Sequence, residues 1–476
     1  MSEARNRGWP HATGRCRLAL ACAWFGLGLT AGFSQVNLYV DPAGLDGTND
    51  CRDAESPCAT VGYALSQSSV NGDTLYLAAG VYTEAGLAIQ SNITIRGAGA
   101  GLTILQAAAT RAAATSRVLW VKSGVTAVVE DVTFRHGQTA SGLPGVAAQG
   151  GAAENGAGLY VNGSAFLYRC LIYDNVTGVG GPGAAGFDGG RGGHGAGLYC
   201  DGLLALVDCV VSNNACGPGG AAGEGGRGGT GGEGAAVHVS GQALLDRSTF
   251  CGNQTGSGGT GANGGSAGSG VLWCSGQLTV RSSTISDNET GSGGAGELGL
   301  GGSGGLGAGL RTMLGAVAIV EYSTVADNRT GAGGTGLTNG AAGYGGGLYA
   351  ATGTLSMTHS IVADNEVAAG GQGADIWGPW VSTGFMLVRD TNDWSVVGDV
   401  VTGQDPLLGA LTQAGGLTPV RPIPFASPAV NAGDPGFIGP PLVDQRGVAR
   451  VQGERIDLGA YELATTTLHV AVGGVD

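Results

Sequence analysis

The sequence predicts an all-β protein, a single-stranded right-handed parallel β-helix whose central turns carry glycine-rich loops. A motif of the form GxGL, or a close variant, recurs at steps of 34 to 39 residues. Its six copies begin at Gly156, Gly195, Gly234, Gly268, Gly307 and Gly345. Short segments with alternating apolar residues follow each copy, and turn residues bound them, which is typical of β-strands. A fixed repeat that stacks like positions on like predicts a solenoid.

An asparagine closes the last strand-like segment of each repeat. The six asparagines are Asn175, Asn214, Asn253, Asn288, Asn328 and Asn365. Each falls where a strand gives way to a turn, and asparagine tolerates left-handed backbone there. Its side-chain amide can also bond to the amide of the next turn. We therefore interpret the six residues as a structural ladder.

Glycine accounts for 97 of the 476 residues and follows a rule in the inserts between repeats. It recurs at every third position from Gly180 to Gly195, from Gly217 to Gly232 and from Gly293 to Gly305. A period of three favours polyproline-II-like segments packed side by side, because only glycine fits where backbones touch. We predict a polyglycine-II-like layer of loops joined by backbone hydrogen bonds. The alternative is a flexible Gly/Ala fringe, which would need no such period.

The N-terminal residues predict export. Arginines precede an apolar run that begins at Leu18 and is short for a membrane span, as in a signal peptide. We assign residues 1–35 to this signal, with a retained anchor or a lipoprotein site at Cys22 as alternatives. The expected location is extracellular or on the cell surface, with no transmembrane segment beyond the signal.

The rest of the chain divides by composition and repeat. We expect the opening and first turns of the β-helix at 36–117, the central repeats with their inserts at 118–390, a closing region at 391–462, and at 463–476 a tail or the start of a truncated further module.

Charge and cysteine content limit the partners and the compartment. The net charge is −14 and lysine occurs once, which argues against a nucleic-acid partner. Eight cysteines follow the signal, so disulfides are permitted. Cys51 and Cys58 would close a short loop. Cys170 and Cys209 share a ladder position, where a disulfide and a stacked pair of free thiols are equally compatible with the strand spacing.

Three stretches resemble known families. LYVDPAGLDGTNDCRDAESPCATVGYAL and GDTLYLAAGVYTE resemble the opening of bacterial surface β-helix proteins of the pectin-lyase-like superfamily. DPLLGALTQAGGLTPVRPIPFASPAVNAGD, DQRGVAR and RIDLGAYE are similar to the terminal region of choice-of-anchor Q domain proteins. The GAGLY and asparagine-ended motifs resemble the GGAI and FxxN repeats of polymorphic outer-membrane adhesins. The resemblance implies a bacterial surface β-helix.

Enzymes of this superfamily need carboxylates that bind Ca²⁺ or that act in pairs. Asp287, Asp327 and Asp364 precede the ladder asparagines of three consecutive turns. Stacked carboxylates repel one another unless they are solvated or bridged by a cation. We therefore consider Ca²⁺ possible at this row; no other cofactor is evident. No basic residue recurs beside the row, and the histidines show no metal-binding spacing.

Aromatic residues recur at one strand position. They are Tyr160, Tyr199, Trp273 and Tyr349, with His238 in the same series. If they face outward they form a flat stripe suited to sugar rings, and otherwise they fill the core or an edge.

These observations favour a non-catalytic surface protein for adhesion, surface layering or polysaccharide binding. The expected partner is a polysaccharide or a component of a cell surface or matrix, and the oligomeric state is not predicted. The alternative is a carbohydrate-active enzyme, a polysaccharide lyase or a glycosidase, whose catalytic residues the sequence does not mark. Fold analogy alone would favour the enzyme, but the sparse basic residues do not.

Overall fold

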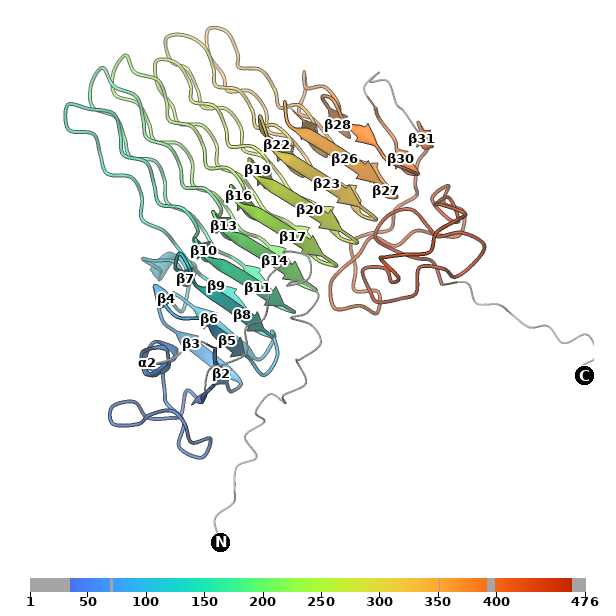
Figure 1. Ribbon diagram of the computed structural model, residues 1–476. Coiled ribbons are helices and arrows are strands. Elements are labelled where there is room, and N and C mark those ends of the chain that lie inside the picture. The colour runs from blue at the N-terminus through green and yellow to red at the C-terminus, as the bar shows by residue number, and fades with distance from the viewer. Residues whose placement is uncertain (1–34, 69–71, 351, 392–398, 465–476) are drawn as a thin grey trace, which may run out of the picture.

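The chain forms the right-handed parallel β-helix that the repeat predicts. The computed structural model describes residues 35–68, 72–350, 352–391 and 399–464. Three parallel sheets run the length of the solenoid, with 11, 9 and 11 strands (Figure 1). The segment predicted as a signal peptide and most of the tail at 463–476 lie outside the described residues. None of the helices in the described part is long and apolar enough to cross a membrane.

Each turn contributes one strand to each sheet, and the sheets are named here by their first strands. The β1 sheet contains β1 (Asn37–Val40), β2 (Asp73–Leu77), β5 (Ile93–Arg96), β8 (Thr126–Glu130), β11 (Ser164–Tyr168), β14 (Leu203–Val207), β17 (Gln242–Asp246), β20 (Gln277–Arg281), β23 (Val317–Glu321), β26 (Thr354–Thr358) and β29 (Val381–Ser382). The β3 sheet contains β3 (Gly80–Thr83), β6 (Thr103–Gln106), β9 (Thr133–Arg135), β12 (Leu171–Tyr173), β15 (Val210–Ser212), β18 (Thr249–Cys251), β21 (Thr284–Ser286), β24 (Thr324–Ala326), β27 (Ser360–Ala363), β30 (Met386–Val388) and β31 (Val400–Thr402). The β4 sheet contains β4 (Leu87–Ile89), β7 (Leu119–Val121), β10 (Leu159–Val161), β13 (Leu198–Cys200), β16 (Val237–Val239), β19 (Leu272–Cys274), β22 (Leu310–Thr312), β25 (Leu348–Ala350) and β28 (Ile376–Trp377). One α-helix, α2 (Val61–Gln67), and one 3₁₀ turn, η1 (Arg111–Ala113), complete the elements of the described residues.

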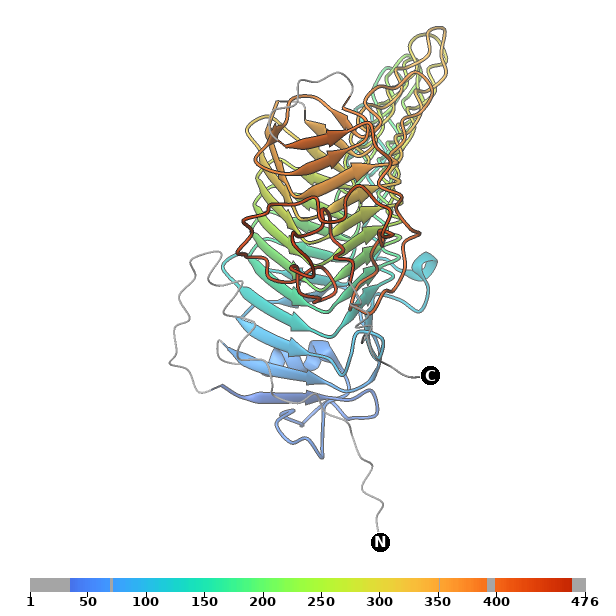
Figure 2. The same ribbon diagram turned by 90° about the vertical axis from the view of Figure 1, so that its right-hand side faces the viewer.

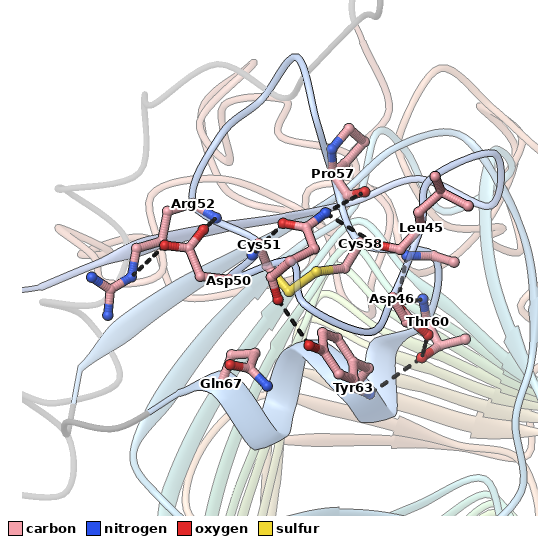
Figure 3. The surroundings of a disulfide bond; sticks show 12 residues. Leu45, Asp46, Asp50, Cys51, Arg52, Pro57, Cys58, Thr60, Tyr63 and Gln67 are labelled. Atoms are coloured by element: carbon pink, nitrogen blue, oxygen red, sulfur yellow. Dashed lines mark hydrogen bonds and ion pairs between the residues drawn. A yellow bond between two sulfur atoms is a disulfide. The ribbon is translucent and has the colours of Figure 1, made fainter.

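The opening of the solenoid carries the disulfide. Cys51 and Cys58 are bonded to each other, as predicted, and both side chains are buried (Figure 3). The segment just before Cys51 contacts α2, where the Tyr63 hydroxyl donates to the carbonyls of Gly47 and Asn49. Disulfide and helix together fix the first strand of the β-helix.

Stacked inward side chains form one continuous core. The register pairs Leu167 with Leu206 and then with Leu245, and all three are fully buried. Because every turn repeats the same inward positions, each turn covers the apolar face of its neighbour. Burial of this stack is the main source of stability.

Two corners of each turn require left-handed backbone. One is the residue before the ladder asparagine, for example Asp287 (φ 58°) and Asp327 (φ 53°). The other follows the β1-sheet strand, for example Asp208 (φ 56°). The ladder asparagine itself therefore does not take the left-handed position, contrary to expectation. The preceding Asp, Asn or Gly does, because these residues reach that region at the lowest cost.

The asparagines form a buried ladder of amides. Their side-chain nitrogens donate to the side-chain oxygen of the next asparagine over 2.8 to 3.0 Å, from Asn175 through to Asn365. Each also donates to strand carbonyls, as Asn253 does to Val211 at 2.9 Å. Asp375 ends the ladder, because its carboxylate accepts from the backbone and side-chain amides of Asn365. The ladder thereby satisfies buried backbone groups where each turn leaves the β3 sheet.

The glycine-rich inserts form an ordered layer that projects from one side of the solenoid (Figure 1) and is thin when seen edge-on (Figure 2). Each loop has an outgoing limb and a return limb, as at 178–186 and 187–194. Backbone hydrogen bonds join limbs of successive turns, for example from Gly180 to Pro218 at 3.0 Å. Others join outgoing to return limbs, from Gly190 to Gly181 and from Gly220 to Gly190. The flexible fringe is therefore not what the structure shows.

Glycine fills most of the limb positions at which two backbones touch. A Cβ atom on Gly180 would lie 2.1 Å from the carbonyl oxygen of Gly190, and one on Gly181 would lie 2.0 Å from that of Leu143. Such contacts are far inside van der Waals distance. The third residue of the triplet is exposed at Val179 and Arg191 and partly exposed at His194 and Thr230. The limbs thus contain triplets of two glycines and one other residue, for example at 189–194. The position of that other residue is called the free position.

The C-terminal region packs along the side of the solenoid. After β31, residues 403–464 lie against the outer face of the β3 sheet (Figures 1 and 2). Outward threonines anchor it: Thr249 donates to the Pro419 carbonyl at 2.6 Å and Thr284 to Gln445 at 2.7 Å. The segment predicted to close the β-helix at 391–462 therefore supplies one strand and then a lateral cover.

A methyl group inside the loop layer should destabilise the protein. In Gly229→Ala the new Cβ would lie 1.8 Å from the Gly190 carbonyl oxygen. We expect a loss of about 1 to 3 kcal/mol in the free energy of unfolding, typical of overpacking. Gly101→Ala is the control, because its Cβ would meet nothing within 4 Å. Denaturant unfolding measures both, and equal losses would contradict an ordered layer.

The end of the asparagine ladder should make stability depend on pH. Burial raises the pKa of the Asp375 carboxyl to about 7, whereas an exposed aspartate titrates near about 3.9. The folded state therefore retains a proton that the unfolded state has released, so stability from this group falls as pH rises from about 4 to about 7. Asp375→Asn should abolish this dependence. If the difference in unfolding free energy between the two proteins stayed constant over that range, the assignment would fail.

Candidate functional site

A row of stacked side chains runs along the outer face of the β4 sheet. It consists of the middle residues of successive strands, Trp120, Tyr160, Tyr199, His238, Trp273, Arg311, Tyr349 and Trp377. The ring centroids of Tyr199 and His238 are 4.6 Å apart, and those of His238 and Trp273 are 4.0 Å apart, with nearly parallel planes. Because neighbouring rings cover each other's faces, the row presents ring edges to solvent. The flat stripe for sugar rings stays a prediction, and stacking at His238 and Trp273 does not favour it in this part of the row.

A groove of about 520 Å³ lies between this sheet and the return limbs of the loops. Its lining residues are Arg191, His194, Thr230, Glu233, Ser266, Ala267, Ser269, Ser303, Gly304, Leu306, Arg311, Ala341, Ala342, Tyr344 and Tyr349. Of the four aromatic residues proposed as ligand contacts, Tyr349 lines the groove, whereas Tyr160, Tyr199 and Trp273 belong to the row beside it. Arg311 is part of both, and its guanidinium lies 5.9 Å from the centre of the Tyr349 ring.

The free positions of the triplets build one wall of this groove. Return limbs contribute pairs of lining residues three apart, such as Arg191 with His194 and Thr230 with Glu233. The glycines between them are held by the layer, so the backbone of the wall is fixed while the side chains vary from turn to turn. In the sequence, the residues that interrupt the glycines are the signal for this wall, whereas the period of three marks only the glycines.

The charged groups of the groove are unequally paired. Arg311 Nη1 donates a hydrogen bond of 3.1 Å to Glu233 Oε1. Burial raises the pKa of Glu233, although Arg311 and Arg191 oppose this shift. Burial lowers the pKa of His194 to about 4 and also lowers that of His238, so both imidazoles are neutral near pH 7. Two arginines therefore face a single carboxylate.

His194, Glu233 and His238 form a cluster that the sequence did not suggest. Their potential ligand atoms lie within 4.8 Å of one another, because adjacent turns bring together residues that are 39 apart in the chain. The absence of metal-binding spacing in the sequence therefore did not indicate that two histidines come together here. His194 Nδ1 accepts a hydrogen bond of 2.9 Å from the Glu233 backbone, which places the proton of the neutral ring on Nε2. Neither ring nitrogen then has a free lone pair, so this conformation of His194 offers a donor rather than a metal ligand.

The carboxylate row predicted as a Ca²⁺ site is paired with arginine. Arg421, from the C-terminal cover, donates to both carboxylate oxygens of Asp287 at 2.9 Å and lies 2.5 Å from Asp327. Arg389 pairs with Asp364. The side chain of Arg421 is 8 % exposed and also donates to Ser286. The positive charge that the row requires thus comes from residues far along the chain, which local spacing does not reveal.

The remaining cysteines are thiols in the described part of the chain. Cys170 and Cys209 do not form the disulfide that we considered. The backbone N–H of Cys170 donates to Cys209 Sγ at 3.4 Å, and the two thiols donate to main-chain carbonyls. Serines continue this arrangement, since Cys209 donates in the same way to Ser248 and Ser248 to Ser283. The sulfurs therefore take the place of hydroxyls in a second polar ladder. Cys200, Cys216, Cys251 and Cys274 are also free.

Comparison with known proteins finds a likeness in structure but not in sequence. No family model matches the chain, and no curated protein matches it. The structure is similar to one described as the crystal structure of pectate lyase Pel9A, with 13 % sequence identity and a TM-score of 0.35. The likeness covers 90 % of this chain and 97 % of that chain. At this level of similarity the likeness carries no information about the role of the groove.

The pairing of Arg421 predicts how the carboxylate row responds to calcium. In the wild-type protein, Ca²⁺ or a chelator should leave the melting temperature unchanged, because a guanidinium already neutralises Asp287 and Asp327. Arg421→Gln should lower the melting temperature, and Ca²⁺ should restore part of the loss. Arg329→Gln is the control, since that side chain is 62 % exposed. Stabilisation of the wild type by Ca²⁺ would show that a metal ion displaces the arginine.

Proposed function

We propose that this protein is a secreted or cell-surface β-helix that binds a polysaccharide in the groove and does not cleave it. The observation that carries the proposal is the wall of variable side chains on a backbone fixed by glycine triplets. This wall includes hydroxyl, charged and aromatic side chains, which suits a ligand with many hydroxyl groups. A wall that is rigid before binding loses little conformational entropy when a ligand enters.

The carboxylates of the groove favour binding over hydrolysis. Glycosidases of the common type use two carboxyl groups that flank the scissile bond. Among the groove-lining residues, Glu233 is the one carboxylate, and it is paired with Arg311. We therefore propose adhesion or attachment to a glycan-rich surface as the role, and a polysaccharide lyase as the alternative to be tested.

The location and the family are part of the same proposal. A buried disulfide at the start of the β-helix suits an oxidising compartment. The C-terminal motifs that resemble choice-of-anchor Q proteins form the lateral cover of the β3 sheet, on another side of the solenoid from the groove. We infer that the loop layer has polyglycine-II-like backbone, because its glycines follow the period that this packing requires.

A matched pair of substitutions tests the groove. Ser303 lines the groove from a return limb, whereas Ser292 occupies a free position on the outgoing limb of the same loop, and both are exposed. Ser303→Trp should fill the groove and reduce retention on a panel of immobilised polysaccharides at least tenfold. Ser292→Trp should bind as the wild type does.

Two outcomes would overturn the proposal. Equal retention of the two tryptophan variants would place binding outside the groove, and retention on no polysaccharide would remove the function itself. Release of unsaturated uronates, followed by ultraviolet absorbance and lost in Arg311→Ala, would replace binding with lyase activity.

A further inference from the structure

We propose that the groove selects an acidic saccharide, whose carboxylate or sulfate group is held between Arg191 and Arg311. This inference rests on the proposed function and specifies its ligand. It follows from the donors that the groove leaves unused, from the charge around them and from the break in the aromatic row.

The arginines of the groove have unused hydrogen-bond donors. Arg191 is exposed, and among the described residues no carboxylate forms an ion pair with it. Arg311 Nη1 donates to Glu233, but the Nε of the same side chain is buried without a hydrogen-bond partner. A buried donor without a partner is costly, and an acceptor supplied by a ligand would remove that cost. Guanidinium groups suit carboxylate and sulfate oxygens in particular.

His194 adds a third donor to the same wall. Its Nδ1 is occupied by the Glu233 backbone, so the ring presents an N–H at Nε2. The neighbouring His238 is 5 % exposed, and its Nδ1 has no hydrogen-bond partner. At His194 Nδ1 a cation would have to displace the Glu233 backbone N–H, and it would meet two arginines. An anion meets donors, so the groove fits an acidic ligand better than a metal ion.

The groove is locally positive in a protein of opposite charge. Arg191 and Arg311 outnumber Glu233, whereas the whole chain carries a net charge of −14. General attraction of polyanions to this protein is therefore not expected, and retention of an acidic glycan must come from a local site. This separates the proposal from nonspecific electrostatic binding.

Arg311 also creates the space for the ligand. It stands in register with Trp273 on one side and Tyr349 on the other, at the one position of the row from Trp120 to Trp377 without an aromatic or imidazole ring. The ring stack ends there, and the groove opens beside it, lined by Tyr344 and Tyr349. A sugar ring can pack against these tyrosines while its acidic group meets the guanidinium.

Two matched pairs of probes test the inference. Alginate is compared with carboxyl-reduced alginate, and dextran sulfate with dextran, so that carboxylate and sulfate are examined separately. We expect the wild-type protein to bind at least one acidic member at least tenfold more tightly than its neutral counterpart. The preference should weaken as salt is raised, because an exposed arginine contributes to it.

Variants locate the preference in the groove. Arg191→Gln and Arg311→Gln should each reduce binding of the acidic probe to the level of the neutral one. Arg191 is exposed, so its variant keeps the proposal testable even if Arg311→Gln folds poorly. Glu233→Gln should strengthen binding of the acidic probe, because it removes a competing negative charge. Arg329→Gln removes the same charge outside the groove and should have no effect.

The outcomes separate this inference from the proposed function. Equal binding of acidic and neutral probes, lost in Ser303→Trp, would overturn the acidic preference and leave glycan binding intact. Binding of none of the probes or of any other polysaccharide would overturn both. If Arg329→Gln weakened binding as much as Arg191→Gln, the attraction would be general and the local site would be wrong.

Discussion

The rest of the structure depends on the hydrogen bonding of each turn to the next at one fixed spacing. Parallel strands set that spacing at about 4.8 Å. The loops keep the same register beyond the sheets, since Gly180 bonds to Pro218 and Gly219 to Ser257, one turn further on. At this spacing the limbs of the layer approach so closely that a Cβ atom is excluded at most of the glycines, as at Gly180 and Gly181. Glycine content, loop order and the groove wall all follow from this single constraint.

Much of the fold could be predicted because its causes are local and repeated. Alternating apolar residues, the recurrent asparagines and the period of the glycines each act within one turn and appear in every turn. The prediction for Asn253 and its equivalents was correct in position but incomplete in cause. Left-handed backbone falls on the residue before each asparagine, and the amide is used for bonds between turns. A sequence pattern marks a corner without stating which of two adjacent residues bends.

The site could not be predicted because its contacts cross turns or the whole chain. His194 and Glu233 meet only when the register between two loops is known. Arg421 reaches Asp287 across 134 residues, through a segment that folds back along the solenoid. Neither contact leaves a motif in the chain. The sequence marks the groove wall only through the positions at which the glycine triplets permit another residue.

Function in such a solenoid is expected where the repeat is broken. The asparagine ladder continues without a gap from Asn175 to Asn365, since one missing amide would leave buried backbone groups unpaired. The row on the β4 sheet has no such obligation, because its outer edge faces solvent. There the series of rings gives way to Arg311, whose guanidinium reaches back two turns to Glu233 of the loop wall. A position that the repeat does not require, filled by a costly partly buried charge, is better explained by a ligand than by the stability of the stack.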